Sequence, residues 1–166
     1  MRWAGSARVK IFNMIKDYEN IDYEILDGEI MEVLGTKVLS GLKYSKTSEW
    51  AKVEGDNVRV GLTDYAQHEL TDIVFVELPK IGAKTKQAEP MATVESVKAA
   101  ADFYAPITGD VVEVNKKLED QPELLNKDPF GDGWMVVIKM SNKKDLNNLM
   151  DPEAYVKHVE TEHHSH

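Results

Sequence analysis

The stretch Val94–Val111, which reads VESVKAAADFYAPITGDV, decides how the rest of the chain is interpreted. Its local pattern is ambiguous, because alanine-rich sequence favours a helix and four of its residues would share one helix face: Val94, Val97, Ala101 and Tyr104. Read in this way, Lys98 is an ordinary exposed lysine in a short helix or turn. The choice between this reading and a functional one depends on the motifs that surround the stretch.

Patterns typical of strands precede it. Asn57–Leu62 alternates with period two after the turn at Gly55–Asn57, as expected of a half-buried strand. Asp64–Gln67 has the form of a capping box and should begin a short helix that ends near Leu70. Further strands are expected at Leu42–Tyr44, Glu49–Glu54 and Ile73–Leu78, the last stopped by Pro79.

Short strands also follow it, and helices are expected only at the margins. The strands are expected at Met91–Val94, Val111–Val114 and Trp134–Met140, and Pro122 with Leu124 indicates a helical turn. Two helical stretches should close the chain, the first capped by Ser141 and the second by Asp151 ahead of Pro152. From about Glu160 the tail is polar and expected to be frayed. Many short strands at this spacing predict an antiparallel sandwich or flattened barrel.

Composition excludes several classes of protein. The 166 residues carry a formal charge of −9, and such an acidic surface repels nucleic acid. The chain has no cysteine, so disulfides, thiolate metal sites and a cysteine nucleophile are excluded. No apolar run approaches the roughly 20 residues that cross a bilayer. Neither a Ser/His/Asp arrangement nor a phosphate-binding glycine loop is present, so no catalytic residue is expected.

The first 36 residues are expected to be an extension of the domain. Residues 1–16 are basic and contain no acid, which is typical of an organelle-targeting segment, whereas residues 17–32 are acidic. A mitochondrial matrix location follows from the first feature, and a mobile or loosely docked extension is the alternative. The remaining chain divides into a domain at residues 37–160 and a polar tail at 161–166.

The segment around Lys98 resembles the lipoylation site of glycine cleavage H proteins. Glu95, Ser96, Val97, Lys98 and Ala99 reproduce the motif, which continues through Asp102 to Pro106–Val111. Family landmarks occur in family order over about residues 37–160, and the first of them resembles eukaryotic members most: Val38–Tyr44, Glu49–Trp50, Val60–Gln67, Asp72–Pro79, Val112–Asn115 and Gly133–Met135.

The resemblance implies a mainly β, lipoyl-domain-like hybrid of barrel and sandwich with short helices and a C-terminal helical segment. Lys98 would sit at the tip of a β-hairpin with arms Met91–Val94 and Ala101–Tyr104, and would carry lipoic acid as an amide. The implied partners are glycine decarboxylase (P protein), aminomethyltransferase (T protein) and dihydrolipoamide dehydrogenase (L protein). A lipoate ligase or a lipoyl or octanoyl transferase would attach the group. The chain would be a monomeric, non-enzymatic carrier, cytoplasmic if its source is prokaryotic.

The resemblance also implies a cleft for the loaded arm. Glu49 and Asp102 match family positions that line it, and Thr47 stands where a serine is common. Carboxylates suit this role because the loaded group is a cationic amine. Three residues depart from the family pattern, Ser48 for a histidine and Thr71 and Ala88 for glycines.

Several alternatives remain open. A lipoyl-relay protein would keep the modification without needing an amine-binding cleft. A biotinyl carrier is disfavoured because Val97-Lys98-Ala99 replaces the usual Met-Lys-Met, and an unmodified interaction module is the third possibility. His163, His164 and His166 could bind a metal only in principle, so no metal site is expected. Trp50 and Trp134 are interpreted as core or near-core aromatics.

Overall fold

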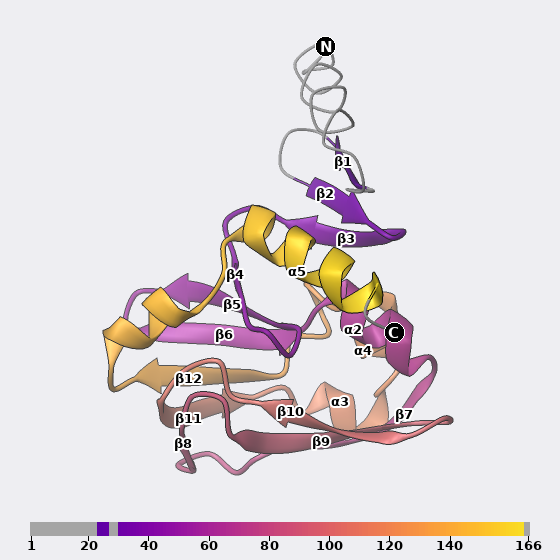
Figure 1. Cartoon of the computed structure of the whole chain (residues 1–166). Helices are drawn as coiled ribbons and strands as arrows, with labels where there is room; N and C mark the ends of the chain where they lie inside the picture. The colour runs from indigo at the N-terminus through magenta and orange to yellow at the C-terminus, as the bar shows by residue number, and fades with distance from the viewer. Residues whose placement is uncertain (1–22, 27–29, 165–166) are drawn as a thin grey trace.

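A six-stranded antiparallel sheet forms the centre of the molecule (Figure 1). The protein was studied as a computed structural model, which describes residues 23–26 and 30–164. The strand order in the sheet is β4-β5-β6-β12-β11-β8. The strands span Lys43–Tyr44 (β4), Glu49–Glu54 (β5), Asn57–Leu62 (β6), Val136–Met140 (β12), Gly109–Val114 (β11) and Lys84–Thr85 (β8). All but the short β8 were predicted from the sequence.

A second antiparallel sheet contains the hairpin that ends at Lys98. It has the order β10-β9-β7, with strands Ala100–Tyr104, Pro90–Ser96 and Ile73–Glu77. Ala101 pairs with Val94 and Ala100 with Glu95, so the chain reverses between Ser96 and Ala100. The hairpin prediction is therefore confirmed and the helical reading is wrong, because backbone pairing across two strands outweighs the local helix propensity of three alanines.

A third sheet joins the start of the described chain to the C-terminal helix. Its strands are β1 (Tyr23–Leu26), β2 (Ile30–Val33) and β3 (Thr36–Leu39). The helix α5 (Pro152–His164) packs against β2, β3 and β4 (Figure 1). The boundary expected near residue 36 thus falls inside a sheet. The expected targeting segment, residues 1–16, lies outside the described residues, as does part of the acidic stretch.

Short helices close the ends of the sheets, and two of the predicted caps are wrong. The helix α2 (Asp64–Leu70) is capped by Thr63, whose Oγ1 accepts the amide of Ala66 at 3.1 Å. The carboxylate of Asp64 instead accepts the amide of Lys37 and the side-chain amide of Gln67. In this helix the residue with extended backbone is the threonine, and only such a residue can act as the cap.

The remaining helices are α3 (Lys117–Asp120), α4 (Leu124–Lys127) and a 3₁₀ helix, η1 (Lys143–Asn148). Asn142, not Ser141, caps η1 by accepting the amide of Lys144 at 3.1 Å. Asp151 caps α5 as predicted, through the amide of Ala154. The helix continues through His164, so residues 160–164 are helical and not the frayed tail expected, because Val159 and Glu160 are buried against the domain.

Two apolar clusters hold these parts together. The first fills the space between the six-stranded sheet and the hairpin sheet, with Val60, Val94, Phe103 and Ile138 in its centre. The second joins the third sheet to α5, and its buried residues are Met31, Val33, Val38, Tyr44, Trp50, Tyr65, Tyr155, Val156 and Val159. Trp134 packs partly buried against this second cluster, so both tryptophans lie where the sequence predicted.

The fold class follows from this packing. Several open antiparallel sheets pack around two apolar clusters, as expected for a hybrid of barrel and sandwich with a C-terminal helix. Within the described part of the chain, no helix is both long enough and apolar enough to span a bilayer.

Candidate functional site

Ser96 organises the turn at the tip of the hairpin. Its amide donates to the carbonyl of Ala99 at 2.8 Å. Its hydroxyl oxygen accepts the amides of Lys98 and Ala99 at 3.2 and 3.0 Å. A serine side chain that bonds nearby backbone amides in this way stabilises a tight turn. Lys98 is therefore presented at the apex by a rigid local scaffold.

Lys98 is exposed and makes a single side-chain hydrogen bond among those found within the described residues. Its Nζ donates to the carbonyl of Glu69, near the end of α2, at 2.9 Å. The backbone of the tip is tied to the same region, because the amide of Val97 donates to the carbonyl of Asp72 at 3.0 Å. Val97 is 69% exposed and Glu95 is also exposed, so the motif residues other than Ser96 face solvent.

Glu49, at the start of β5, is a buried carboxyl surrounded by donors. It is 1% exposed. Ser45 donates a very short hydrogen bond to its Oε1, Thr47 donates to the same atom at 2.5 Å, and the amide of Tyr104 donates to Oε2 at 3.1 Å. Burial raises the pKa of Glu49 to about 7, although these donors partly offset the effect by favouring the ionised form.

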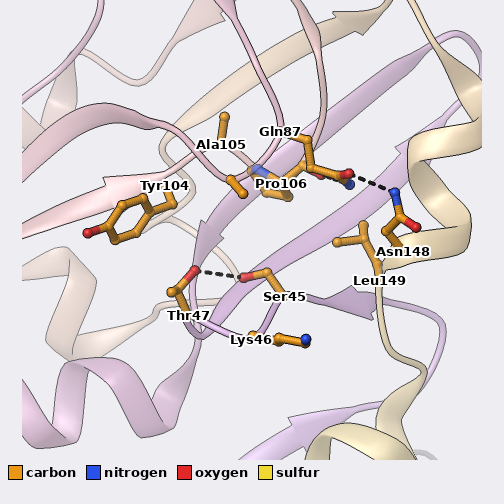
Figure 2. Close-up of a pocket in the computed structure, with 10 residues that line it drawn as sticks. Ser45, Lys46, Thr47, Gln87, Tyr104, Ala105, Pro106, Asn148 and Leu149 are labelled. Atoms are coloured by element: carbon orange, nitrogen blue, oxygen red, sulfur yellow. Dashed lines mark hydrogen bonds between the residues drawn. The ribbon is translucent and has the colours of Figure 1, made fainter.

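A cleft of about 320 Å³ is lined by residues that donate hydrogen bonds to this carboxyl (Figure 2). Its polar wall contains three of the groups just described, Ser45, Thr47 and Tyr104. The opposite wall is fixed by Gln87, which accepts a hydrogen bond from the side chain of Asn148 and donates to the carbonyls of Pro106 and Asp145. The other lining residues are Lys46, Ala88, Ala105, Pro106 and Leu149, most of them apolar. The cleft can thus accept a chain that is apolar along its length and polar at one end.

Asp102 lies on β10, opposite Thr93 and two residues before Tyr104. Its side chain is exposed and makes no hydrogen bond or ion pair among those of the described residues. Thr47 and Glu49 are therefore in direct contact, whereas Asp102 does not touch them and lies along the strand that leads from the tip toward the cleft.

Sequence reasoning missed the residues that complete the site. A serine four positions before Glu49 was a usable signal for Ser45, because a hydroxyl in a tight turn often bonds the residue that closes it. Tyr104 and Gln87 gave no such signal, because their contacts join segments far apart in the chain.

The three departures from the family pattern share one property. Ser48, Thr71 and Ala88 all have positive φ, at 67°, 63° and 71°. Thr71 and Ala88 thus adopt a backbone conformation that favours glycine, the residue usual at these two positions. Among the described residues, no group of three or more His, Cys, Asp or Glu side chains is placed to hold a metal ion.

Comparisons with known proteins identify the family of the chain. The family model "Glycine cleavage H-protein" matches residues 42–162. The glycine cleavage system H protein of Stenotrophomonas maltophilia (strain R551-3) is 51% identical over 130 residues, which are 78% of this chain and 99% of the relative. That of Coprothermobacter proteolyticus is 56% identical over 120 residues, covering 72% of this chain and 94% of the relative.

An archaeal relative and a solved structure extend the comparison. The probable glycine cleavage system H protein of Aeropyrum pernix is 50% identical over 131 residues, 78% of this chain and 92% of the relative. The crystal structure of the H protein from Mycobacterium marinum superposes with a TM-score of 0.67 at 31% identity, covering 74% of this chain and 98% of that one. These relatives are bacterial or archaeal, so the expected affinity with eukaryotic members stays a prediction. The family model, which matches most of the chain, and these relatives show that the chain belongs to the glycine cleavage H-protein family.

Proposed function

We propose that Lys98 carries a lipoyl group in amide linkage and that the cleft beside Glu49 receives the loaded end of this arm. As a member of its family, the chain is the lipoyl carrier of the glycine cleavage system and has no catalytic activity of its own. The assignment of individual residues rests on the exposed amine at the hairpin tip and the buried carboxyl beside the cleft.

The surroundings of Lys98 fit a covalent arm. The amine is exposed and, among the described residues, is bound only by the carbonyl of Glu69, so an attaching enzyme can reach it. An amide nitrogen at this position keeps one hydrogen, which the same carbonyl can accept.

The length of the arm can be compared with the path along the hairpin toward the cleft. A lipoyl-lysine extends roughly 14 Å, because its dozen or so bonds each advance about 1.2 Å. Asp102 lies at most about 13 Å along the hairpin arm at ~3.3 Å per residue, and Tyr104 about 20 Å. The extended arm is therefore long enough to reach Asp102, which lies on the strand that leads to the cleft.

The residues around Glu49 suit a cationic amine. When bound, the lipoyl group supplies a disulfide whose sulfur takes up the aminomethyl group left by glycine decarboxylation. A cation beside Glu49 lowers the pKa of this carboxyl below about 7, so the carboxylate is ionised at neutral pH when it is needed. Ser45, Thr47 and the amide of Tyr104 hold its oxygens in place. Asp102 adds a second negative charge along the approach.

This cleft favours the carrier role over a lipoyl relay. A relay protein has no need for a buried carboxyl with three donors, since it transfers the lipoyl group itself. The proposed partners are the P, T and L proteins and an enzyme that attaches lipoate, and the chain is proposed to act as a monomer. Its bacterial and archaeal relatives favour a prokaryotic cytoplasm over the mitochondrial matrix.

Reconstitution tests the proposal. The chain would be lipoylated by a lipoate ligase and mixed with purified P, T and L proteins, glycine, tetrahydrofolate and NAD⁺. We expect glycine-dependent formation of NADH with the lipoylated chain and none with the unmodified chain. A lipoylated chain that supports no turnover, but passes its lipoyl group to another carrier protein, would instead indicate a relay.

A further inference from the structure

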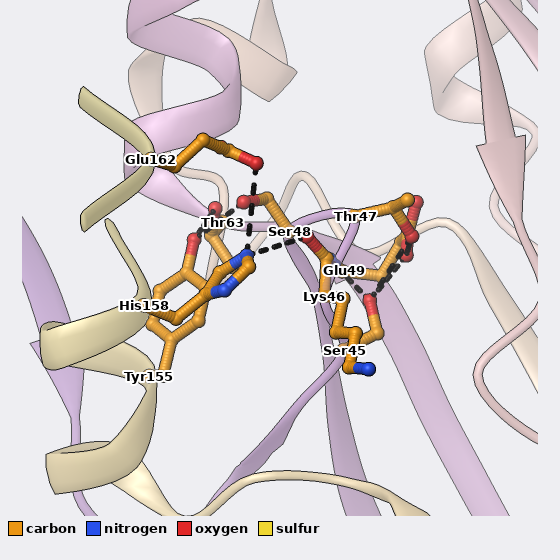
Figure 3. Close-up of polar contacts among 9 residues, drawn as sticks. All are labelled: Ser45, Lys46, Thr47, Ser48, Glu49, Thr63, Tyr155, His158 and Glu162. Atoms are coloured by element: carbon orange, nitrogen blue, oxygen red, sulfur yellow. Dashed lines mark hydrogen bonds and ion pairs between the residues drawn. The ribbon is translucent and has the colours of Figure 1, made fainter. Parts of the chain in front are cut away.

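The loop that places Thr47 beside Glu49 is hydrogen-bonded to the C-terminal helix α5. This loop, residues 45–48, connects β4 to β5 and is closed on its own side by Ser45, whose amide donates to the carbonyl of Glu49 at 2.9 Å. Its other side faces α5, which contributes Tyr155 and His158 (Figure 3). The two contacts fall on either side of Thr47.

Tyr155 holds the loop at Ser48. It is fully buried, and its hydroxyl donates to Ser48 Oγ at 2.8 Å. The hydroxyl oxygen of Tyr155 also lies 2.8 Å from Thr63 Oγ1, which in turn accepts the amide of Ala66 at the start of α2. Burial holds the pKa of Tyr155 well above its ordinary value, so the hydroxyl keeps the proton that it donates.

Ser48 needs this support. It is buried, and its φ of 67° lies in the left-handed region, which costs free energy for any residue with a side chain. Its carbonyl accepts the amide of Thr63 at 3.1 Å, so hydroxyl and backbone are bound at the same place. These contacts keep the backbone beside Thr47 in a conformation that an isolated loop would leave.

His158 holds the loop at Lys46. Its Nε2 lies 2.8 Å from the carbonyl of Lys46, which can only accept, so this nitrogen carries a hydrogen. Glu162, one helical turn further, lies 3.7 Å from the same nitrogen. The helix is thus hydrogen-bonded to Lys46, before Thr47, and to Ser48, after it.

We propose that Tyr155 and His158 are positioning residues that keep the hydroxyl of Thr47 on the carboxylate of Glu49. In functional terms this rests on the amine-holding role proposed for Glu49. The proposal predicts that α5, which does not line the cleft, controls the protonation of Glu49 and therefore the affinity of this carboxyl for the amine. The geometry supports it because the side chain of Thr47 is exposed and bonds, within the described residues, only to Glu49 and Ser45.

The experiment compares two buried tyrosines, Tyr155 and Tyr44, whose stacked rings have centroids 4.5 Å apart. Tyr155→Phe removes the hydroxyl that holds Ser48. Tyr44→Phe is the matched control, because the hydroxyl of Tyr44 bonds, within the described residues, only to the backbone of Leu39, away from the loop. The readout is the pKa of Glu49, measured by ¹³C NMR on the full, unmodified chain with labelled glutamate.

We expect Tyr155→Phe to raise the pKa of Glu49 by about one unit, because a freed Thr47 no longer stabilises the ionised form. Tyr44→Phe should leave this pKa within about 0.3 unit of wild type while losing a comparable amount of stability. An equal pKa of Glu49 in the two variants would overturn the proposal.

His158 gives a second route that avoids the buried tyrosines. His158→Leu removes the donor to Lys46 and should raise the pKa of Glu49 in the same direction, whereas His158→Gln keeps an N–H and should restore it. A pKa unchanged in His158→Leu would remove His158 from the proposal.

The lifetime of the aminomethyl-loaded chain separates the two proposals. If Tyr155→Phe shifts the pKa of Glu49 and also shortens this lifetime several-fold, positioning and amine-holding both stand. A shifted pKa with an unchanged lifetime would keep the positioning role and refute the amine-holding role of Glu49.

Discussion

The hairpin tip at Lys98 and the buried carboxyl of Glu49, called the floor below, differ in burial and in the range of their hydrogen bonds. Lys98 is exposed, held by a turn whose hydrogen bonds are mostly local, and bonded through its side chain to Glu69 alone among the described residues. Glu49 is buried and receives donors from two segments far apart in the chain. The side chain of Lys98 can be modified or replaced without disturbing the fold. The carboxyl of Glu49, in contrast, is buried in an environment that disfavours its charge. Substitutions at the tip should therefore affect function alone, and those at the floor should affect both function and stability.

The largest effect is expected at the tip. Lys98→Arg should abolish lipoylation, because a guanidinium stays protonated and cannot act as the acyl-accepting amine. The free energy of unfolding should change by no more than about 0.5 kcal/mol, as for other exposed positions. Intact-mass spectrometry after incubation with a lipoate ligase measures the first quantity and denaturant unfolding the second. Lys52→Arg, at an exposed position on β5, is the control and should be lipoylated fully. A lipoyl adduct on Lys98→Arg would refute the assignment of the site.

The second prediction concerns the stability of the floor. Burial raises the pKa of Glu49 from 4.5 to about 7, so its contribution to stability is complete below pH 4.5 and is lost as the pH rises through 7. Glu49→Gln has no such dependence. Its oxygen can accept from the amide of Tyr104, while its amide can donate to Ser45 and Thr47. Between pH 5 and pH 8.5, wild type should lose about 3 kcal/mol more than the variant.

Urea unfolding of both chains at the two pH values measures this difference. Glu113→Gln, at an exposed position on β11, is the control and should follow wild type. Parallel pH dependences of wild type and Glu49→Gln would show that the carboxyl titrates in the folded chain as it does in the unfolded one.

The contrast between tip and floor also explains what the sequence could predict. Most strands of the six-stranded sheet could be predicted because alternation is a local pattern, whereas the hairpin at Lys98 was predicted only by resemblance to the family, since its local sequence also fits a helix. Glu49 and Thr47 were identified by resemblance to the family, but their burial and their donors could not be predicted. These depend on Tyr104 and on α5, which reach the loop from 55 residues or more away along the chain. The caps of α2 and η1 were missed by one residue each, because the backbone conformation of a cap is set by the turn before it.

The third prediction tests the cleft directly. The double variant Glu49→Gln, Asp102→Asn should be lipoylated normally, because the attaching enzyme acts at the tip. Its aminomethyl-loaded form should release ammonia and formaldehyde about ten-fold faster than wild type above pH 7, because a charge-assisted hydrogen bond contributes roughly 1.5–3 kcal/mol. The advantage of wild type should fade as the pH falls toward 5 and Glu49 gains a proton. Release of formaldehyde, followed by trapping, gives the rates. Equal rates in the two chains would make these acids ordinary charges.

The smallest effect is expected at Thr71, the residue that joins α2 to β7 behind the tip. Its backbone angles, φ 63° and ψ −150°, are those of a region almost restricted to glycine, and such strain costs of order 1–3 kcal/mol. Thr71→Gly should relieve it. Part of the gain is offset by the greater freedom of glycine in the unfolded chain, about 0.4–1 kcal/mol, so the net increase in the free energy of unfolding should be about 1 kcal/mol. The bonds of the backbone at this position, from its amide to the carbonyl of Gln67 and from Asn126 to its carbonyl, do not need the side chain.

Thr71→Ala is the matched control, because it removes the hydroxyl but keeps the Cβ, and its free energy of unfolding should not increase. Lipoylation of Lys98 should be unchanged in both variants, since the carbonyl of the neighbouring Asp72 still accepts the amide of Val97 at the tip. If Thr71→Gly were no more stable than Thr71→Ala in urea unfolding, the strain at this junction would be too small to matter, and the glycine usual at this position would need another explanation.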